Sequence, residues 1–169
     1  SVNAHTHLEL SHIADKTRWG HGFTAWLQGL VPLLGAAPQT DAVENACASL
    51  ALYGTLYVGN ITGSLPGGTV LADSACNEAG LTASHFCEWF GYDAPFADNE
   101  RPWPPRCRQA LADDPFLMAR CAPGGHALYS TGPEILAAAR QDCLRMGRVF
   151  SFHLAESPEE TQMLTTGDG

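Results

Sequence analysis

Apolar positions along the chain follow two spacings, and the two spacings alternate. Short runs rich in β-branched, aromatic and other apolar residues predict five strands, at residues 1–7, 55–61, 81–87, 116–121 and 148–153. Apolar residues that recur every three or four positions predict helices at residues 22–34, 40–53, 70–78, 106–112 and 130–146. The polar stretch 9–21 and the proline-rich stretch 91–106 are expected to be loops. A capping box over residues 157–160 predicts the start of a further helix, and Thr40 is expected to be the N-cap of the second helix.

Five strand–helix units in succession predict parallel strands joined by right-handed helical crossovers. An open doubly wound sheet and a (β/α)8 barrel both fit this alternation, but the glycine-rich stretches do not match G-x-G-x-x-G, which favours the barrel. The predicted fold is α/β, of the (β/α)8 TIM-barrel type, with the first five β/α units present. A complete barrel needs about 200 residues or more, and this chain has 169. We therefore expect residues 1–169 to form a partial barrel and to be a segment of a longer chain.

Polar side chains gather at the C-terminal ends of the predicted strands, where barrel enzymes collect their catalytic groups. Alternate side chains of a strand share a face, so His5 and His7 can direct both imidazoles at one point. Imidazole is a common metal ligand, and catalytic zinc sites typically use three protein ligands. A His-x-His pair by itself is weak support, because a surface or core pair is about as frequent. A second strand-like run that ends in a histidine, His153, strengthens the interpretation.

Composition narrows the class of partner. The chain has 9 Lys and Arg against 18 Asp and Glu, a formal net charge of −9. This balance argues against nucleic acids and anionic membranes, since phosphate binding needs clustered cations. No apolar run approaches the roughly 20 residues of a membrane span. The six cysteines form no Cys-x-x-Cys pair and several lie in apolar periodic segments, which favours reduced thiols and a cytoplasmic location.

Three ordered motifs resemble the amidohydrolase superfamily, in particular its deaminase and chlorohydrolase branch. They are Asn3-Ala4-His5-Thr6-His7-Leu8-Glu9-Leu10-Ser11, His126-Ala127-Leu128-Tyr129-Ser130-Thr131 and His153-Leu154-Ala155-Glu156-Ser157-Pro158-Glu159-Glu160. The resemblance implies one divalent metal, zinc or alternatively iron, held by His5, His7 and His153. It also implies that Glu156 is the proton shuttle and that His126 contacts the substrate. The combination is similar to aminofutalosine, S-adenosylhomocysteine and methylthioadenosine deaminases, which implies hydrolytic deamination of a cyclic, purine-like small molecule.

The residue types suit such a reaction. A metal held by neutral imidazoles lowers the pKa of bound water from 15.7 to roughly 7, so hydroxide becomes available to attack a ring carbon that bears an amino group. A nearby carboxylate must collect the proton and pass it to the departing ammonia. Glu156 lies three residues beyond His153, outside the expected ligand set. Its alternative role is that of an acid at a helix N-terminus, where the dipole favours it.

The sequence also departs from the family pattern. The family has a histidine after the sixth strand and an aspartate metal ligand after the eighth, and this sequence includes neither. An alternative hypothesis is therefore a non-catalytic half-barrel, inactive alone, and a third is a metal-free scaffold. Binuclear members use a carbamylated lysine at the fourth strand, whereas Lys16 lies in the first predicted loop, which disfavours a binuclear site.

An open parallel sheet has unpaired edges, so we expect self-association or association with the remainder of the polypeptide.

The remaining candidates have weaker patterns. Glu88 is expected either to contact substrate or to form a salt bridge at the rim, and His126 has the alternative of a loop histidine. Glu9, two residues from His7, is expected to support the loop rather than bind metal. The others are interpreted as structural or packing residues, with a pocket wall as the alternative for the two tryptophans: His12, His21, His85, Trp19 and Trp89.

Overall fold

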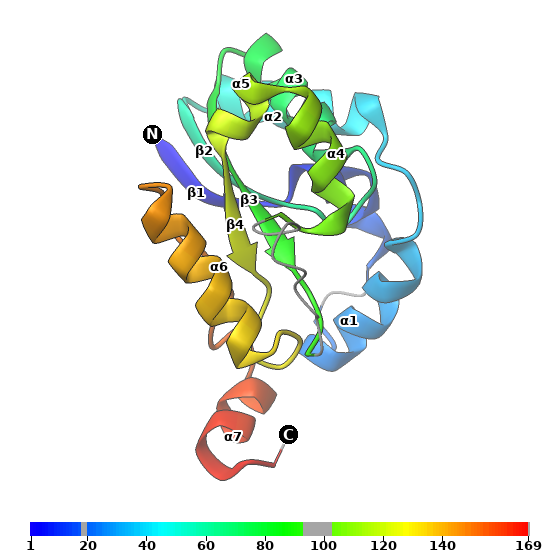
Figure 1. Ribbon diagram of the computed structural model, residues 1–169. Helices are drawn as coiled ribbons and strands as arrows, with labels where there is room; N and C mark the ends of the chain where they lie inside the picture. The colour runs from blue at the N-terminus through cyan, green and yellow to red at the C-terminus, as the bar shows by residue number, and fades with distance from the viewer. Residues whose placement is uncertain (18–19, 93–102, 169) are drawn as a thin grey trace.

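The computed structural model of the chain describes residues 1–17, 20–92 and 103–168 (Figure 1). Four strands form one parallel sheet in the order β1-β2-β3-β4. The elements in chain order are β1 (Val2–Thr6), η1 (Leu8–Lys16), α1 (Phe23–Leu30), η2 (Val31–Leu33), α2 (Thr40–Leu52), β2 (Tyr57–Thr62), α3 (Gly68–Glu78), β3 (Thr82–Trp89), α4 (Pro105–Asp113), α5 (Pro115–Arg120), β4 (Cys121–Gly125), α6 (Pro133–Arg145) and α7 (Pro158–Thr166).

Helical crossovers join the strands, so all four C-terminal ends lie at one edge of the sheet. Tyr57 of β2 is opposite Val2 of β1 and Thr82 of β3, and His85 of β3 is opposite Cys121 of β4. Sequential parallel pairing is the topology of a (β/α)8-type barrel rather than of a doubly wound sheet, whose strand order reverses. The predicted α/β class and parallel sheet are confirmed.

The helices pack against the sheet through three groups of buried residues. Val43 and Cys47 of α2 pack with Ala72 and Cys76 of α3 and with Val58 of β2. Helices α4 and α5 contribute a second group, and in a third Ile135 and Ala139 of α6 pack with Trp89 of β3. Helix α6 also lies along β4 (Figure 1). All six cysteines are free thiols and are buried. None of the helices in the described part of the chain has both the length and the apolar character needed to cross a membrane.

The predicted strand at 116–121 is wrong, because this segment is the helix α5. The Asp114 side chain accepts hydrogen bonds from the backbone N–H groups of Phe116 and Leu117, at 2.8 and 3.0 Å, and Pro115 takes the first helical position. Cap and proline together start a helix, and they outweigh the strand preference of the residues that follow. The strand β4 begins only at Cys121.

The predicted strand at 148–153 is also wrong as a regular strand. It lies beside β4, but its pairing is limited to a bridge between Ala127 and His153 and to a bond from Gly125 N–H to the Ser151 carbonyl at 3.2 Å. In a parallel strand, residues 123 and 125 direct their N–H groups to the same side. Pro123 has no N–H to donate, which interrupts the ladder on this side of β4.

Two smaller predictions are corrected as well. Residues 9–21 were expected to be a loop, but most of the segment forms the 3-10 helix η1. Helix α2 begins at Thr40, so Gln39 and not Thr40 is its N-cap. Ser157 caps α7 as predicted, since its hydroxyl accepts from the Glu160 N–H at 3.1 Å. Most of the predicted loop at 91–106 lies outside the described residues.

Asp73 on α3 joins three elements of the fold. Its carboxylate accepts hydrogen bonds from Arg120 Nε at 2.7 Å and Nη2 at 2.5 Å, and His85 Nε2 lies 3.2 Å from Oδ1. Burial by itself would raise the pKa of Asp73, but the hydrogen bonds from His85 and Arg120 outweigh it and hold the pKa well below its usual range. The ionised carboxylate therefore stabilises the packing of α3 against β3 and the end of α5.

We expect Asp73→Asn to lower the free energy of unfolding at pH 7 by about 2 kcal/mol, since hydrogen bonds to a charged group are lost. The folded-state pKa is depressed below the ordinary value of 3.8, so this stability is present above that pH and is lost as the pH falls further. The difference between the original protein and the variant should shrink in acid. Denaturant titrations over a pH series measure it, and Asp15→Asn, at an exposed position on η1, is the matched control. A difference that stays constant with pH would contradict this role.

Candidate metal centre and its pocket

Three histidine side chains meet at the C-terminal edge of the sheet. The Nε2 atoms of His5 and His7 lie 3.1 Å apart, those of His7 and His153 lie 3.3 Å apart, and those of His153 and His5 lie 3.2 Å apart. His5 and His7 come from β1 and from the residue just after it, and His153 comes from the bridge beside β4. The sequence predicted this triangle, and the fold brings its three members together.

The triangle has the dimensions of one face of a tetrahedral metal site. A zinc–nitrogen distance of about 2.0 to 2.1 Å and tetrahedral angles give nitrogen–nitrogen separations of about 3.3 Å. Without a cation, three ring nitrogens at this separation cannot satisfy one another, because each imidazole nitrogen is either a donor or an acceptor. His5, His7 and His153 therefore fit a divalent metal by geometry and by chemistry.

The surroundings keep two of the three imidazoles in the neutral form that binds metal. Burial, together with the neighbouring histidines, lowers the pKa of His7 to about 3. Burial and His153 also lower the pKa of His5, while Glu156 opposes the shift. A neutral imidazole offers a lone pair, and a protonated one does not. Around neutral pH, His5 and His7 are ready to act as ligands.

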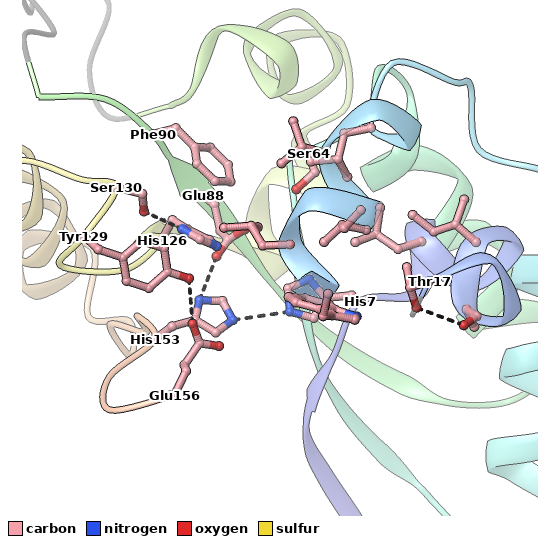
Figure 2. Close-up of a pocket in the computed structure, with 18 of the residues that line it drawn as sticks. His7, Thr17, Ser64, Glu88, Phe90, His126, Tyr129, Ser130, His153 and Glu156 are labelled. Carbon is pink, nitrogen blue, oxygen red and sulfur yellow. Dashed lines mark hydrogen bonds and ion pairs between the residues drawn. The ribbon is translucent and has the colours of Figure 1, made fainter. Parts of the chain in front are cut away.

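The third histidine lies against a buried carboxylate. Figure 2 shows the His153 ring between Glu88 and His7, with Nδ1 3.1 Å from Glu88 Oε1 and Nε2 directed at the triangle. Burial would lower the pKa of His153, but Glu88 outweighs burial and raises it. The contact is not a well-aligned hydrogen bond, but a carboxylate on this side of the ring favours the tautomer with its proton on Nδ1. That tautomer leaves the Nε2 lone pair free for a metal, which is the usual arrangement around a metal-bound histidine.

Glu88 at the end of β3 is 3% exposed, so it is not an exposed acid at the rim. It lines the pocket, and its two oxygens have no protein hydrogen-bond donor in good geometry. Burial raises the pKa of this carboxyl to about 7, against the opposing effect of His153. Glu88 can therefore either donate or accept a hydrogen bond near neutral pH.

His126 and Glu156 lie on the wall of the same pocket (Figure 2). His126 Nδ1 lies 2.5 Å from the Ser130 hydroxyl, and its ring stacks on Phe90 with centroids 4.5 Å apart. Burial, with a contribution from His153, lowers the pKa of His126 to about 4. A neutral ring held at both face and edge presents a fixed surface to the cavity, and His126 is not a free loop histidine.

Glu156 is exposed and borders the cavity next to the triangle. The Tyr129 hydroxyl donates to its Oε2 at 2.9 Å, and its backbone N–H donates to the Glu160 carboxylate at 2.7 Å. Ala155, just before it, has a φ of 57°, a left-handed conformation that non-glycine residues rarely adopt. Such strain is typical of functional sites, and here the turn directs Glu156 back over the pocket.

The cavity beside the triangle has a volume of about 600 Å³. One side carries the polar groups described above, and the other side is apolar. The apolar wall comes from η1, α1 and the end of η2, and consists mainly of Leu10, Ile13, Trp26, Leu27, Leu30 and Leu34. This volume and this mixture of one apolar wall with a few convergent polar groups are typical of small-molecule sites.

The other sequence candidates lie away from the triangle or support it. The Glu9 carboxylate is buried and accepts hydrogen bonds from the Ser64 N–H at 2.7 Å, the Leu65 N–H at 3.0 Å and the Thr62 hydroxyl at 2.7 Å. It therefore supports the loop after β2, and not the stretch 9–21 in which its supporting role was expected. Trp89 packs in the core with α6, and Trp19 lies outside the described residues.

Sequence reasoning missed two contributors to the site. Tyr129 holds Glu156 and lines the cavity, although it stands inside a motif that was singled out for His126. Asn60 of β2 accepts a hydrogen bond from the Leu8 N–H at 2.9 Å, directly after His7. No local pattern marks Asn60, because its partners are 52 and 25 residues away.

No protein-family model and no curated protein matches this chain. Solved structures do. Over 99% of its length the chain is similar to aminofutalosine deaminase from Helicobacter pylori in complex with methylthio-coformycin, with a TM-score of 0.76 and 24% identity. It is also similar to an adenosine deaminase from Xanthomonas campestris with bound zinc (TM-score 0.65, 18% identity over 99%) and to a triazine hydrolase from Arthobacter aurescens (0.63, 15% over 98%).

The chain has the fold of these hydrolases. It spans 40%, 39% and 42% of their respective lengths. The sheet described above therefore corresponds to part of a (β/α)8-type barrel, as the sequence predicted. At these identities the likeness establishes the fold, and the chemistry has to be argued from the site.

We expect the protein to bind one Zn²⁺ at the histidine triangle. Zinc at 100 times its dissociation constant should raise the free energy of unfolding by about 2.7 kcal/mol. His153→Ala should abolish most of this gain, whereas His21→Ala, at an exposed position outside the triangle, should not. Metal analysis after dialysis and thermal unfolding with and without zinc measure both. Unchanged zinc stoichiometry in His153→Ala would exclude the site.

Proposed function

We propose that this chain is part of a metal-dependent hydrolase of the amidohydrolase superfamily that deaminates a cyclic, purine-like small molecule. The observation that supports the proposal is the triangle of Nε2 atoms, 3.1 to 3.3 Å apart, at the C-terminal edge of a parallel sheet. His5, His7 and His153 would hold the metal, with zinc favoured over iron because a structure of the same fold contains zinc. When bound, the metal supplies a water of lowered pKa.

The chain's own residues account for proton movement and substrate orientation. Glu156 lies outside the triangle but beside it, so its carboxylate would take a proton from water and deliver it to the leaving amino group. The Tyr129 hydroxyl orients this carboxylate through Oε2. Burial and the neighbouring Glu156 raise the pKa of Tyr129, so the hydroxyl keeps its proton and remains a donor.

Glu88 and His126 would bind the substrate ring. Glu88 has buried oxygens without a well-oriented protein donor, and its carboxyl, with a pKa of about 7, can form a hydrogen bond with a ring nitrogen in either protonation state. The neutral His126 ring, stacked on Phe90, would contact the substrate from the other side. A site whose buried polar groups lack a hydrogen-bond partner in the protein binds selectively those ligands that supply the partner.

A second candidate is a half-barrel without activity of its own. It is favoured by the chain's coverage of about two fifths of the related structures, since residues elsewhere in a longer protein would complete the ligand set.

A cytoplasmic location is part of the proposal, because six buried free thiols suit a reducing compartment.

In the full-length protein, we expect Glu156→Gln to lower kcat by about 10²- to 10⁴-fold, because an amide cannot transfer the proton. Zinc content should remain unchanged, since Glu156 is not a ligand. Ammonia release from aminofutalosine, S-adenosylhomocysteine and methylthioadenosine measures the effect. Glu159→Gln, at an exposed position in the first turn of α7, is the control and should retain activity. Full activity in Glu156→Gln would contradict the assigned role, and ammonia release by the isolated 169-residue chain would exclude the inactive half-barrel.

The 169-residue chain should self-associate when it is isolated. In a longer polypeptide, the remainder of the chain would cover the same surface. β1 is an edge strand, and exposed apolar residues surround its start, with Val2 68% and Tyr57 54% exposed. Light scattering should report a mass above the 18.0 kDa of one chain. Val2→Lys should reduce association, since an edge lysine blocks strand pairing, while Val70→Lys on α3 should not. A monomer at all concentrations would contradict this expectation.

A further inference from the structure

A row of hydrogen-bonded polar side chains crosses the sheet and ends at the peptide that follows His7. Arg120 binds the Asp73 carboxylate, and Asp73 Oδ1 lies 3.2 Å from His85 Nε2. On the other edge of the same ring, His85 Nδ1 lies 3.2 Å from Asn60 Nδ2. Asn60 Oδ1 then accepts from the Leu8 N–H at 2.9 Å. The side chains are drawn from α3, β2, β3 and the end of α5.

The chemistry of the end group fixes the direction of every bond in this row. The backbone N–H of Leu8 is a donor, so Asn60 must present its oxygen there and its amide N–H to His85. His85 Nδ1 must then be the acceptor, which places the ring proton on Nε2, facing Asp73. The carboxylate of Asp73 accepts from both sides. Only one tautomer of His85 satisfies all of these partners.

The row lies where the regular sheet does not hold β1. The register between β1 and β2 shifts between Asn3 and Thr6, so the ladder is interrupted at the level of His5. His7 is the N-cap of η1 and makes no side-chain cap bond. Asn60, which is fully buried, also lies 3.3 Å from the Thr6 hydroxyl. Its side-chain oxygen thus accepts hydrogen bonds from the residues on both sides of His7.

A row of buried polar groups does not stabilise a fold more than well-packed apolar residues would. When every polar group in the row has its hydrogen bond, the row holds its surroundings in one arrangement. Here it holds the peptide that follows His7. We propose that Asn60 and His85 are positioning residues for the metal centre, since they hold the His7–Leu8 peptide so that His7 Nε2 stays in the triangle. This inference rests on the proposed metal site.

Two replacements of His85 separate positioning from packing. Asparagine places an acceptor at the position of Nδ1 and so keeps the hydrogen bond from Asn60. Glutamine places a donor at the position of Nε2 and keeps only the hydrogen bond to Asp73. We expect His85→Gln and Asn60→Ala to weaken Zn²⁺ binding on the order of tenfold, as other outer partners of ligands do, and His85→Asn to bind more tightly than His85→Gln. Asn77→Ala removes a different bond to Asp73, from an exposed position, and should leave affinity unchanged.

Zinc dissociation constants come from competition with a chelating dye, and the visible spectrum of the Co²⁺-loaded protein reports ligand geometry. Both are measured on the full chain at a temperature where circular dichroism shows each metal-free variant to be folded. If the original protein and Asn60→Ala bind zinc equally, or if affinity follows stability and not the order of the two His85 variants, the positioning role is wrong while the metal centre stands. If the original protein binds no zinc, both fall together.

Discussion

The structure depends on three imidazole nitrogens that face one another at a separation of 3.1 to 3.3 Å. Groups of this kind have no mutual hydrogen-bonding solution, so the contact is unfavourable unless a cation is shared. The protein nevertheless builds it from two segments 146 residues apart. It also places Glu88 behind His153, which supports that ring from the side opposite to the metal. Surrounding structure that stabilises an otherwise unfavourable arrangement is the mark of a functional site.

Two buried carboxylates near this edge differ in how many hydrogen-bond donors the protein gives them. Glu9 and Glu88 are 1% and 3% exposed, and burial raises the pKa of both. Glu9 receives backbone donors from the loop after β2, including Ser64 and Leu65, and is thereby satisfied. Glu88 has His153 as its polar neighbour and otherwise lines the cavity. The number of donors, and not the burial, leaves Glu88 available to a ligand.

Periodicity in the sequence predicted most of the helices and the first three strands, because those segments have few competing signals. It failed where neighbouring residues outside an apolar run decided the structure of that run. Asp114 and Pro115 turned an apolar run into α5, and Pro123 interrupted the pairing between β4 and residues 148–153, whose sequence resembles a strand. The histidine triangle was predictable because strand alternation acts locally. Asn60 was not, since its bonds reach across three elements.

Both parts of the chain that supply the histidine triangle are held by side chains rather than by continuous ladders. The register of β1 shifts between Asn3 and Thr6, and residues around His153 pair with β4 only at isolated points. Sheet pairing alone therefore leaves the three histidines less tightly fixed than the strands beneath them. The hydrogen bond that the Asn60 side chain accepts from the Leu8 N–H and the contact of His153 with Glu88 supply part of the missing restraint. A metal that joins both segments would supply the rest, so the free energy of metal binding would add to the stability of this edge of the sheet.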